Sequence, residues 1–576
     1  MRLCGELAEL AAIFVTPITQ TDRWPLTHAQ HERENISDMI ATNRFTRLLT
    51  AAIIIFIACV IRTVHIKADT PAGFSSDHGT YVDEGYKTLA VRNLFLFGAE
   101  KWHPADTYPG WLSASPLTQW SYYLSFLASR PDIAAARAVT IVYYALFLVL
   151  YFFLLYGRYS PAVFYGGLLL FSLESTLFFF SRIALFEIPM VTFFYALVMS
   201  FIRIPETKSN VAIFFALGAA AILAFSIKKS ALVYFCPVFL AIVISLLHRH
   251  ANSVRLARYF LALAAGVVIL LSLTYGAWSA RLALDPYAYL FRLIDNPLVK
   301  VSPFVFFAGL FCAIYGILYQ PTPYLKNLFR LTLMCLVVLG PIVLALFKVH
   351  PLRYYVPFLP AYVLISIEWL SIRKVSCDLS GPSLLRTVLA VFLLTLFISY
   401  CAVALGVEDR INIMSFRNVI LLGVTVAFIV SLIWVLRRFV FSEIATLALV
   451  LGLLALGLTQ SLVRVGDFLA NPSFAAEQVR HELVMNVNSD EVIAGDWAPF
   501  FALGTPIRAL YSIKAFNTLS ALLQIKPQYF LHSDSGSSMY QRNSLQRQAG
   551  ISLGSPYNLG TYNGSKVILY SLRYAR

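Results

Sequence analysis

The chain has 576 residues, of which 59% are hydrophobic and only 13% are charged. Soluble domains are about 45–50% apolar and about 25% charged, so this composition excludes an ordinary soluble protein. The formal net charge of +15 does not require a nucleic-acid partner, because basic loops beside anionic lipid explain it more directly.

Apolar runs long enough to cross a bilayer recur along the chain. About 20 apolar residues suffice for one helical span, and this criterion predicts about 13 spans. The runs are continuous rather than alternating, which favours a helical bundle over a strand barrel. We therefore predict a polytopic α-helical membrane protein. Its spans are expected near residues 46–66, 133–155, 161–180, 184–203, 211–227, 231–247, 257–278, 303–319, 328–347, 354–372, 384–406, 417–436 and 443–462.

The distribution of basic residues predicts the orientation of these spans. Lys and Arg concentrate on the cytoplasmic side of membrane proteins. With the N-terminus inside, every inside loop carries a basic residue, and residues 1–44 form a cytoplasmic extension. An odd number of spans then places the C-terminal tail on the outer face of the cytoplasmic (inner) membrane. The active site is expected to lie on the extracytoplasmic side of the membrane.

The first outside loop, residues 67–132, carries two adjacent carboxylates, Asp83 and Glu84. Ionised groups beside hydrocarbon are costly and are typically functional. Apolar periodicity predicts one helix from 84 to 97 and another from 117 to 128, both lying along the membrane surface.

Two later segments stand outside the predicted spans. Residues 279–302 are polar and then amphipathic, which suits either a lid over a site or a plain connector with an interfacial helix. From residue 463 the apolar runs shorten, and strands are predicted at 492–494, 529–531 and 566–570, with a helix at 474–484. We predict a transmembrane module over 45–462 and a small extracytoplasmic α/β domain over 463–576.

The seven cysteines do not indicate a disulfide framework or a metal site. None lies in the loop around Asp83 or in the tail, and none has the spacing of metal ligands. We expect no cofactor, with a divalent cation left open as an alternative.

Seven charged residues from four separate stretches are predicted to share the outer membrane face. A lipid phosphate at that depth needs Arg and Lys as partners. A carboxylate can deprotonate an incoming hydroxyl, and a phosphate leaving group needs charge neutralisation. The set therefore suggests group transfer from a lipid phosphate. Its members are Asp83, Glu84, Arg182, Glu187, Lys228, Lys229 and Arg353.

Short motifs in a fixed order carry a family resemblance. The sequence Tyr-Val-Asp-Glu-Gly-Tyr at 81–86, followed by Ala-Val-Arg-Asn at 90–93, resembles the first-loop signature of GT-C membrane glycosyltransferases. The similarity is greatest to the protein O-mannosyltransferase and aminoarabinose-transferase-like branch. It covers roughly residues 46–370. Further matching segments lie at 134–137, 181–182, 187–189 and 228–230, and at 353–354 with Pro357 and Pro360.

The resemblance implies a GT-C fold and inverting transfer of a sugar from a polyprenyl-phosphate donor to a hydroxyl of a protein, lipid A or another glycan. It makes Asp83 the general base and Glu84 its orienting or acceptor-contacting neighbour. Glu187 stands where the family often has Asp, which leaves its role open. The residues assigned to substrate binding are Arg182, Glu187, Lys228, Lys229, Arg353 and Tyr354.

Plainer interpretations stay open beside this one. Asp83 could cap the first-loop helix, Arg182 and Glu187 could form a structural ion pair, and the lysines and Arg353 could be interfacial anchors. A transporter or flippase of lipid-linked saccharides is the main alternative function. We find no related halves with matching broken helices, which that class commonly has. A structural assembly factor is a weaker alternative.

Overall fold

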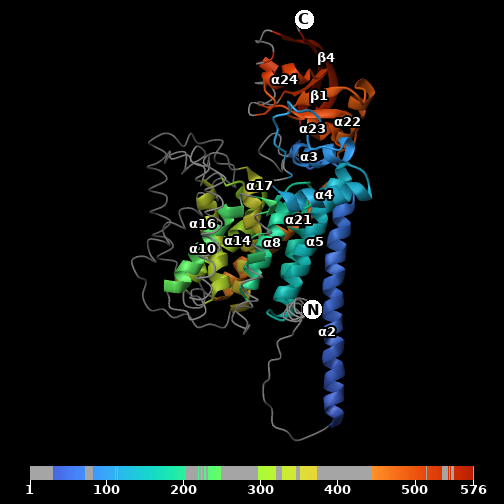
Figure 1. The fold of residues 1–576 in the computed structure, drawn as a ribbon. Coiled ribbons are helices and arrows are strands. Elements are labelled where there is room, and N and C mark those ends of the chain that lie inside the picture. The colour runs from blue at the N-terminus through green and yellow to red at the C-terminus, as the bar shows by residue number, and fades with distance from the viewer. Residues whose placement is uncertain are drawn as a thin grey trace, which may run out of the picture.

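The structure, a computed structural model, consists of a helical bundle with a small sheet above it (Figure 1). It describes residues 30–71, 82–110, 112, 115–202, 218–219, 222, 226–228, 231–247, 296–319, 327–345, 351–372, 443–513, 516–534, 542–543, 545 and 550–574. Within this part of the chain, three helical stretches are long and apolar enough to cross a membrane. They are Phe45–Thr63, Ile133–Leu155 and Leu447–Asn486.

These stretches correspond to α2 (Gln30–Thr63), α5 (Ile133–Leu155) and α21 (Glu443–Ala470) continued by α22 (Ala475–Asn486). The apolar helices support the prediction of a membrane protein. The remaining bundle helices are shorter: α6 (Pro161–Leu173), α7 (Ser175–Phe180), α8 (Glu187–Ser200), α10 (Ala231–Leu247), α13 (Pro297–Val301), α14 (Pro303–Tyr319), α16 (Leu328–Ala345), α17 (Leu352–Tyr355), η5 (Val356–Phe358) and α18 (Leu359–Ile372).

The predicted count of about 13 spans is not confirmed. The spans predicted near 257–278, 384–406 and 417–436 lie outside the described residues, as does most of 211–227. The same holds for residues 279–295 of the proposed lid.

The predicted span at 161–180 is two helices rather than one. Glu174 lies between α6 and α7, where its Oε2 accepts the backbone N–H of Leu177 at 2.7 Å. Its Oε1 accepts the hydroxyl of Ser302 at 2.6 Å. The buried carboxylate therefore caps α7 at the break, and its other oxygen bonds to a residue far along the chain.

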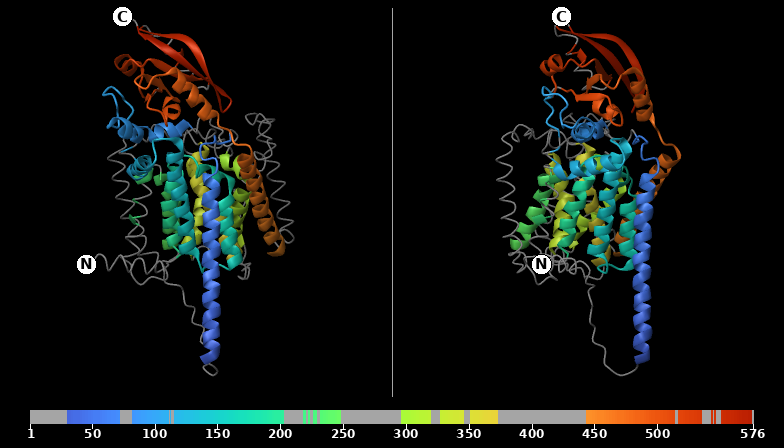
Figure 2. Two further views of the ribbon diagram at one scale, coloured as in Figure 1. Left: turned by 90° about the vertical axis from the view of Figure 1, so that its right-hand side faces the viewer. Right: turned by 45° about the vertical axis from the view of Figure 1, so that its right-hand side comes forward.

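The two first-loop helices form where they were predicted, as α3 (Asp83–Phe97) and α4 (Pro116–Ala128). However, α3 lies between the bundle and the C-terminal sheet, as two further views show (Figure 2). Its first three turns are buried. A Cβ on Gly85 would lie 2.2 Å from the backbone nitrogen of Phe500 in α23 (Ala498–Ala502). Only glycine permits this approach of the two backbones.

The C-terminal sheet has five strands in the order β2-β1-β3-β5-β4. The strands β1 (Val492–Gly495), β2 (Arg508–Tyr511) and β3 (Tyr529–Ser533) are parallel, and β4 (Ile551–Tyr562) and β5 (Ser565–Tyr574) are antiparallel. A short helix, α24 (Leu519–Ile525), precedes β3. The prediction found β1, β3 and β5. It missed β2, which has four residues, and β4, which contains two register shifts.

Side chains of the first loop attach this sheet to the bundle. Arg92 donates from Nη2 to the carbonyls of Thr505 at 2.8 Å and Ile507 at 2.5 Å. Asn517 donates from Nδ2 to Asp106 Oδ1 at 2.7 Å. The C-terminal sheet thus holds the helix that begins with the two carboxylates.

Asp69 makes a second attachment, between the end of the first span and α22. Its Oδ2 accepts the hydroxyl of Ser473 at 2.8 Å and the backbone N–H of Ala475 at 2.6 Å. The carboxylate therefore caps α22 from a different part of the chain.

Candidate functional site

Asp83 is the first residue of α3 and forms an ion pair with Arg353 of α17. The carboxylate is 7% exposed. Val82 occupies the N-cap position and makes no capping hydrogen bond, so Asp83 lies in the first turn of the helix rather than at its cap. The ion pair joins the first loop to a segment 270 residues later, as the predicted cluster requires.

Glu84 has a different environment, wholly inside the protein. Its carboxylate is fully buried and accepts two hydrogen bonds from Arg137, at 2.9 Å from Nε and 2.7 Å from Nη2. It also accepts the backbone N–H of Ala184 at 2.7 Å. Arg137 in turn donates to the carbonyls of Ile66 and Ala68. These bonds favour an orienting role for Glu84 over contact with an acceptor.

Glu187 begins α8 and forms an ion pair with Lys228. The ammonium of Lys228 lies 4.8 Å from the centre of the Tyr354 ring, and the guanidinium of Arg353 lies 5.5 Å from the same centre. Tyr354 therefore contacts a cation of each ion pair. The structure thus brings together Asp83, Glu187, Lys228, Arg353 and Tyr354, which we call the charged cluster.

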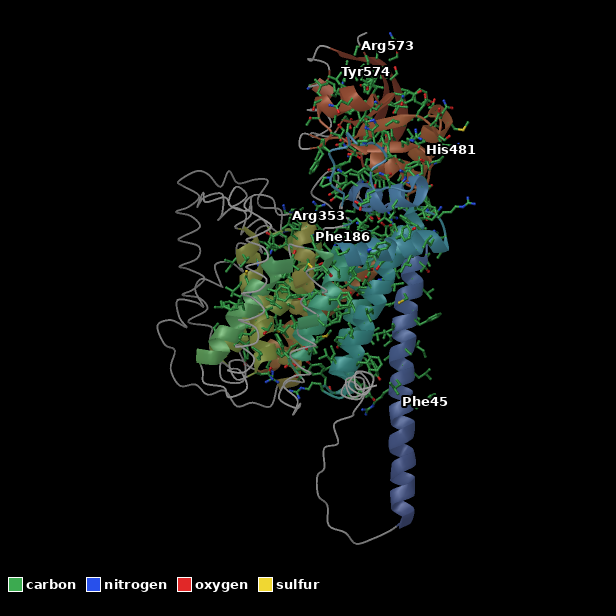
Figure 3. All side chains as sticks on the ribbon, in the orientation of Figure 1. Phe45, Phe186, Arg353, His481, Arg573 and Tyr574 are labelled. Atoms are coloured by element: carbon green, nitrogen blue, oxygen red, sulfur yellow. The ribbon has the colours of Figure 1, made fainter. Side chains whose placement is uncertain are left out.

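The charged cluster lies at the end of the bundle nearest the sheet. Arg353 and Phe186, which directly precedes Glu187, both lie at this level (Figure 3). The charged cluster thus lies on the side of the bundle that faces the C-terminal sheet.

Arg182 has its contacts elsewhere. Its Nη2 donates to the carbonyl of His65 at 2.6 Å, and its guanidinium lies 4.3 Å from the centre of the Phe468 ring in α21. The alternative of an ion pair between Arg182 and Glu187 is not observed, since Glu187 pairs with Lys228. Lys229 lies outside the described residues.

Lys87 joins the charged cluster although the prediction did not assign it a role. Its ammonium lies 4.8 Å from the centre of the Phe186 ring. Burial and the neighbouring Lys228 lower the pKa of Lys87 to about 7, while Glu187 acts in the opposite direction. Its position four residues after Asp83 is the sequence signal, because residues at this spacing share one face of a helix.

Aromatic rings from the first loop and the C-terminal sheet meet above this helix. Tyr86 of α3 stacks on Tyr511 of β2 with 4.6 Å between ring centres. Tyr108 contacts Tyr511 edge-on at 5.0 Å, and Phe516 contacts Tyr108 at 5.4 Å. No local sequence pattern indicates that rings of the tail reach α3. Such stacked rings fix the position of the sheet over the site.

No protein-family model matches this chain, and no curated protein matches it either. Among the solved structures similar to it are ArnT from Cupriavidus metallidurans bound to undecaprenyl phosphate and the same protein in the apo state. Each is 12% identical with a TM-score of 0.49 over 92% of this chain. The matched regions cover 97% and 98% of the two ArnT chains, respectively.

Proposed function

We propose that this protein is a glycosyltransferase that transfers a sugar from a polyprenyl-phosphate-linked donor to a hydroxyl acceptor at the outer face of the cytoplasmic membrane. The observation that carries the proposal is the charged cluster, in which the carboxylate of Asp83 meets Arg353 beside Lys228. The motif order described above supports the same activity.

The cations of the cluster suit a phosphate. Arg353 and Lys228 come from different segments, and their cationic groups lie 5.5 and 4.8 Å from the centre of the same tyrosine ring, which puts two positive charges in one part of the site. Guanidinium and ammonium groups bind phosphate oxygens through charge-assisted hydrogen bonds. They also stabilise the negative charge that develops on a phosphate as it leaves.

Asp83 supplies the base of the proposed reaction. The acceptor oxygen attacks the anomeric carbon of the sugar, and its proton passes to the carboxylate of Asp83. The bond from that carbon to the phosphate oxygen breaks, and the polyprenyl phosphate departs with the electron pair. Attack opposite the leaving group inverts the anomeric configuration. The acceptor is proposed to be a hydroxyl of a protein, lipid A or another glycan.

The test is a transfer assay with the full chain in lipid nanodiscs. Polyprenyl-phosphate hexoses and pentoses serve as donors, and cell-envelope glycolipids and proteins serve as acceptors. Asp83→Asn is expected to lower turnover by a factor of about 10²–10⁴, because the amide cannot accept the proton of the acceptor, while donor binding is kept. Normal turnover in this variant would overturn the assignment of the base.

Asp467→Asn is the matched control, because Asp467 is exposed on α21, where its carboxylate accepts a hydrogen bond from Asn471 at 3.0 Å. It is expected to leave turnover unchanged. Translocation of the lipid-linked sugar without transfer, measured in proteoliposomes, would favour the flippase alternative instead.

A further inference from the structure

Three tyrosines in and beside the charged cluster have hydroxyls that make no hydrogen bond within the described part of the chain. They are Tyr86, Tyr354 and Tyr511, and each is only partly buried. Neighbouring tyrosines differ from them. The hydroxyl of Tyr108 donates to the carbonyl of Tyr86 at 3.1 Å. The hydroxyl of Tyr234 donates to the carbonyl of Tyr354 at 2.9 Å. Because a tyrosine hydroxyl inside a protein usually finds a partner, the three unbonded hydroxyls are available to a ligand.

Tyr86 and Tyr511 lie beside the proposed base. Tyr86 follows Asp83 by three residues, so the two side chains share one face of α3. Its ring stacks on that of Tyr511 with 4.6 Å between ring centres. Glu187 acts electrostatically on Tyr86, and Arg353 acts on Tyr511. Each of the two hydroxyls is therefore near one of the two ion pairs of the charged cluster.

The topology of the C-terminal sheet brings Tyr511 to this place. Tyr511 is the last residue of β2 and pairs with Gly495, the last residue of the parallel strand β1. The helix that follows β1, α23, packs closely on Gly85 of α3. Both strands therefore end over the first turn of α3. The carboxyl ends of parallel strands are a common place for ligands to bind.

We infer that Tyr86 and Tyr511 bind the sugar of the polyprenyl-phosphate donor through their hydroxyls, so that the C-terminal sheet contributes a residue to the sugar site. This inference rests on the proposed function. The sugar is bonded directly to the phosphate, so a phosphate that contacts Arg353 brings the sugar beside these rings. A phenol both donates and accepts hydrogen bonds, which matches the hydroxyls of a sugar.

Both phenols stay protonated at neutral pH. Burial raises the pKa of Tyr511 to about 12, an effect that Asp496 increases and Arg353 opposes. Burial also raises the pKa of Tyr86 well above its ordinary value. Each hydroxyl is therefore a hydrogen-bond donor under the conditions of a binding assay.

The experiment compares lipids with and without a sugar, bound to the full chain in nanodiscs. The probes are polyprenyl phosphate and its mannose, glucose and arabinose derivatives. Tyr511→Phe and Tyr86→Phe each remove one hydroxyl and keep the ring, so the stacking is retained. Tyr108→Phe is the matched control, because it belongs to the same group of rings but its hydroxyl already bonds to the carbonyl of Tyr86.

The wild-type protein is expected to bind at least one sugar-bearing lipid more tightly than polyprenyl phosphate. Tyr511→Phe and Tyr86→Phe should each weaken binding of that lipid about threefold to tenfold, in keeping with loss of one hydrogen bond. Neither should change binding of polyprenyl phosphate. Tyr108→Phe should affect both lipids equally.

A purely structural role of the rings predicts that Tyr511→Phe and Tyr86→Phe change binding of the two lipids equally or not at all, and that result would overturn the inference. A wild-type protein that does not prefer any of the sugar-bearing lipids would overturn it too. A selective loss in one variant alone would confine the role to that residue.

The outcome separates this inference from the proposed function. If neither variant is selective while Asp83→Asn still abolishes transfer, only the sugar-binding role of the tyrosines is wrong. If the wild-type protein binds none of the four lipids, the proposed function is wrong as well.

Discussion

Two adjacent carboxylates of this protein have opposite surroundings. Glu84 is 0% exposed and accepts three hydrogen bonds, two from Arg137 and one from a backbone N–H. Asp83, the residue before it, meets the cations of the charged cluster through its ion pair with Arg353. Successive residues of an α-helix point about 100° apart, so a single step along α3 separates the two environments.

Two neighbouring residues of one helix can therefore differ in use. Glu84 bonds to the surrounding protein, whereas Asp83 faces the charged cluster. A carboxylate whose oxygens are fully bonded to fixed protein groups cannot readily accept a proton from a substrate. A carboxylate held by a single arginine has fewer such bonds to give up. The contrast fits the proposed roles, a positioning residue for Glu84 and a base for Asp83, and each role can be tested separately.

The largest expected effect on stability comes from Glu84→Gln. It leaves the buried guanidinium of Arg137 without its counter-charge, which typically costs about 3–5 kcal/mol. Thermal unfolding in nanodiscs checks this. Asp83→Asn should change the unfolding temperature far less, because Asp83 and Arg353 are both more exposed than the Glu84–Arg137 pair. Equal losses in the two variants would remove the distinction between the carboxylates.

An intermediate effect is expected from Gly85→Ala. The added methyl group would overlap the backbone of α23 at Phe500, and overpacking of this kind costs about 1–3 kcal/mol. Because α3 would have to shift, transfer activity should fall together with stability. Gly466→Ala is the matched control, since nothing lies within 4 Å of a Cβ at that helical glycine. An active, stable Gly85→Ala protein would argue against close packing of α3 on α23.

The smallest of these effects is expected from Asp69→Ala. It removes the cap of α22 that also joins the first span to the C-terminal sheet, and loss of a cap costs about 0.5–2 kcal/mol. Limited proteolysis near residue 473 measures the loosening. Turnover of the intact protein should change little, because Asp69 makes no contact with the charged cluster among the described residues.

Much of the helical framework could be predicted from the sequence. Continuous apolar runs placed helices at 133–155, 231–247 and 303–319 with the observed bounds. The break at Glu174 was missed, because it depends on a hydrogen bond from Ser302, which no local pattern reveals.

The candidate site was predictable in part. The predicted topology placed Asp83, Glu187, Lys228 and Arg353 at the outer membrane face. The structure joins them as two ion pairs. The same reasoning placed Arg182 with them, but a cation-π contact with a distant ring holds it elsewhere. The C-terminal residues that contact α3 were not predicted. The pattern of charges along the chain does not tell which loop the sheet will cover.

The hydrogen bonds that Arg92 donates to the C-terminal region have a consequence for how the protein assembles during synthesis. The carbonyl of Thr505, one of the three acceptors of Arg92, is 413 residues downstream. At roughly 5–20 residues per second, the ribosome needs on the order of tens of seconds to make that distance. Until Thr505 and Ile507 are made, Arg92 lacks these two acceptors, so α3 cannot complete its contacts with the C-terminal sheet. These contacts therefore form only when translation is nearly complete.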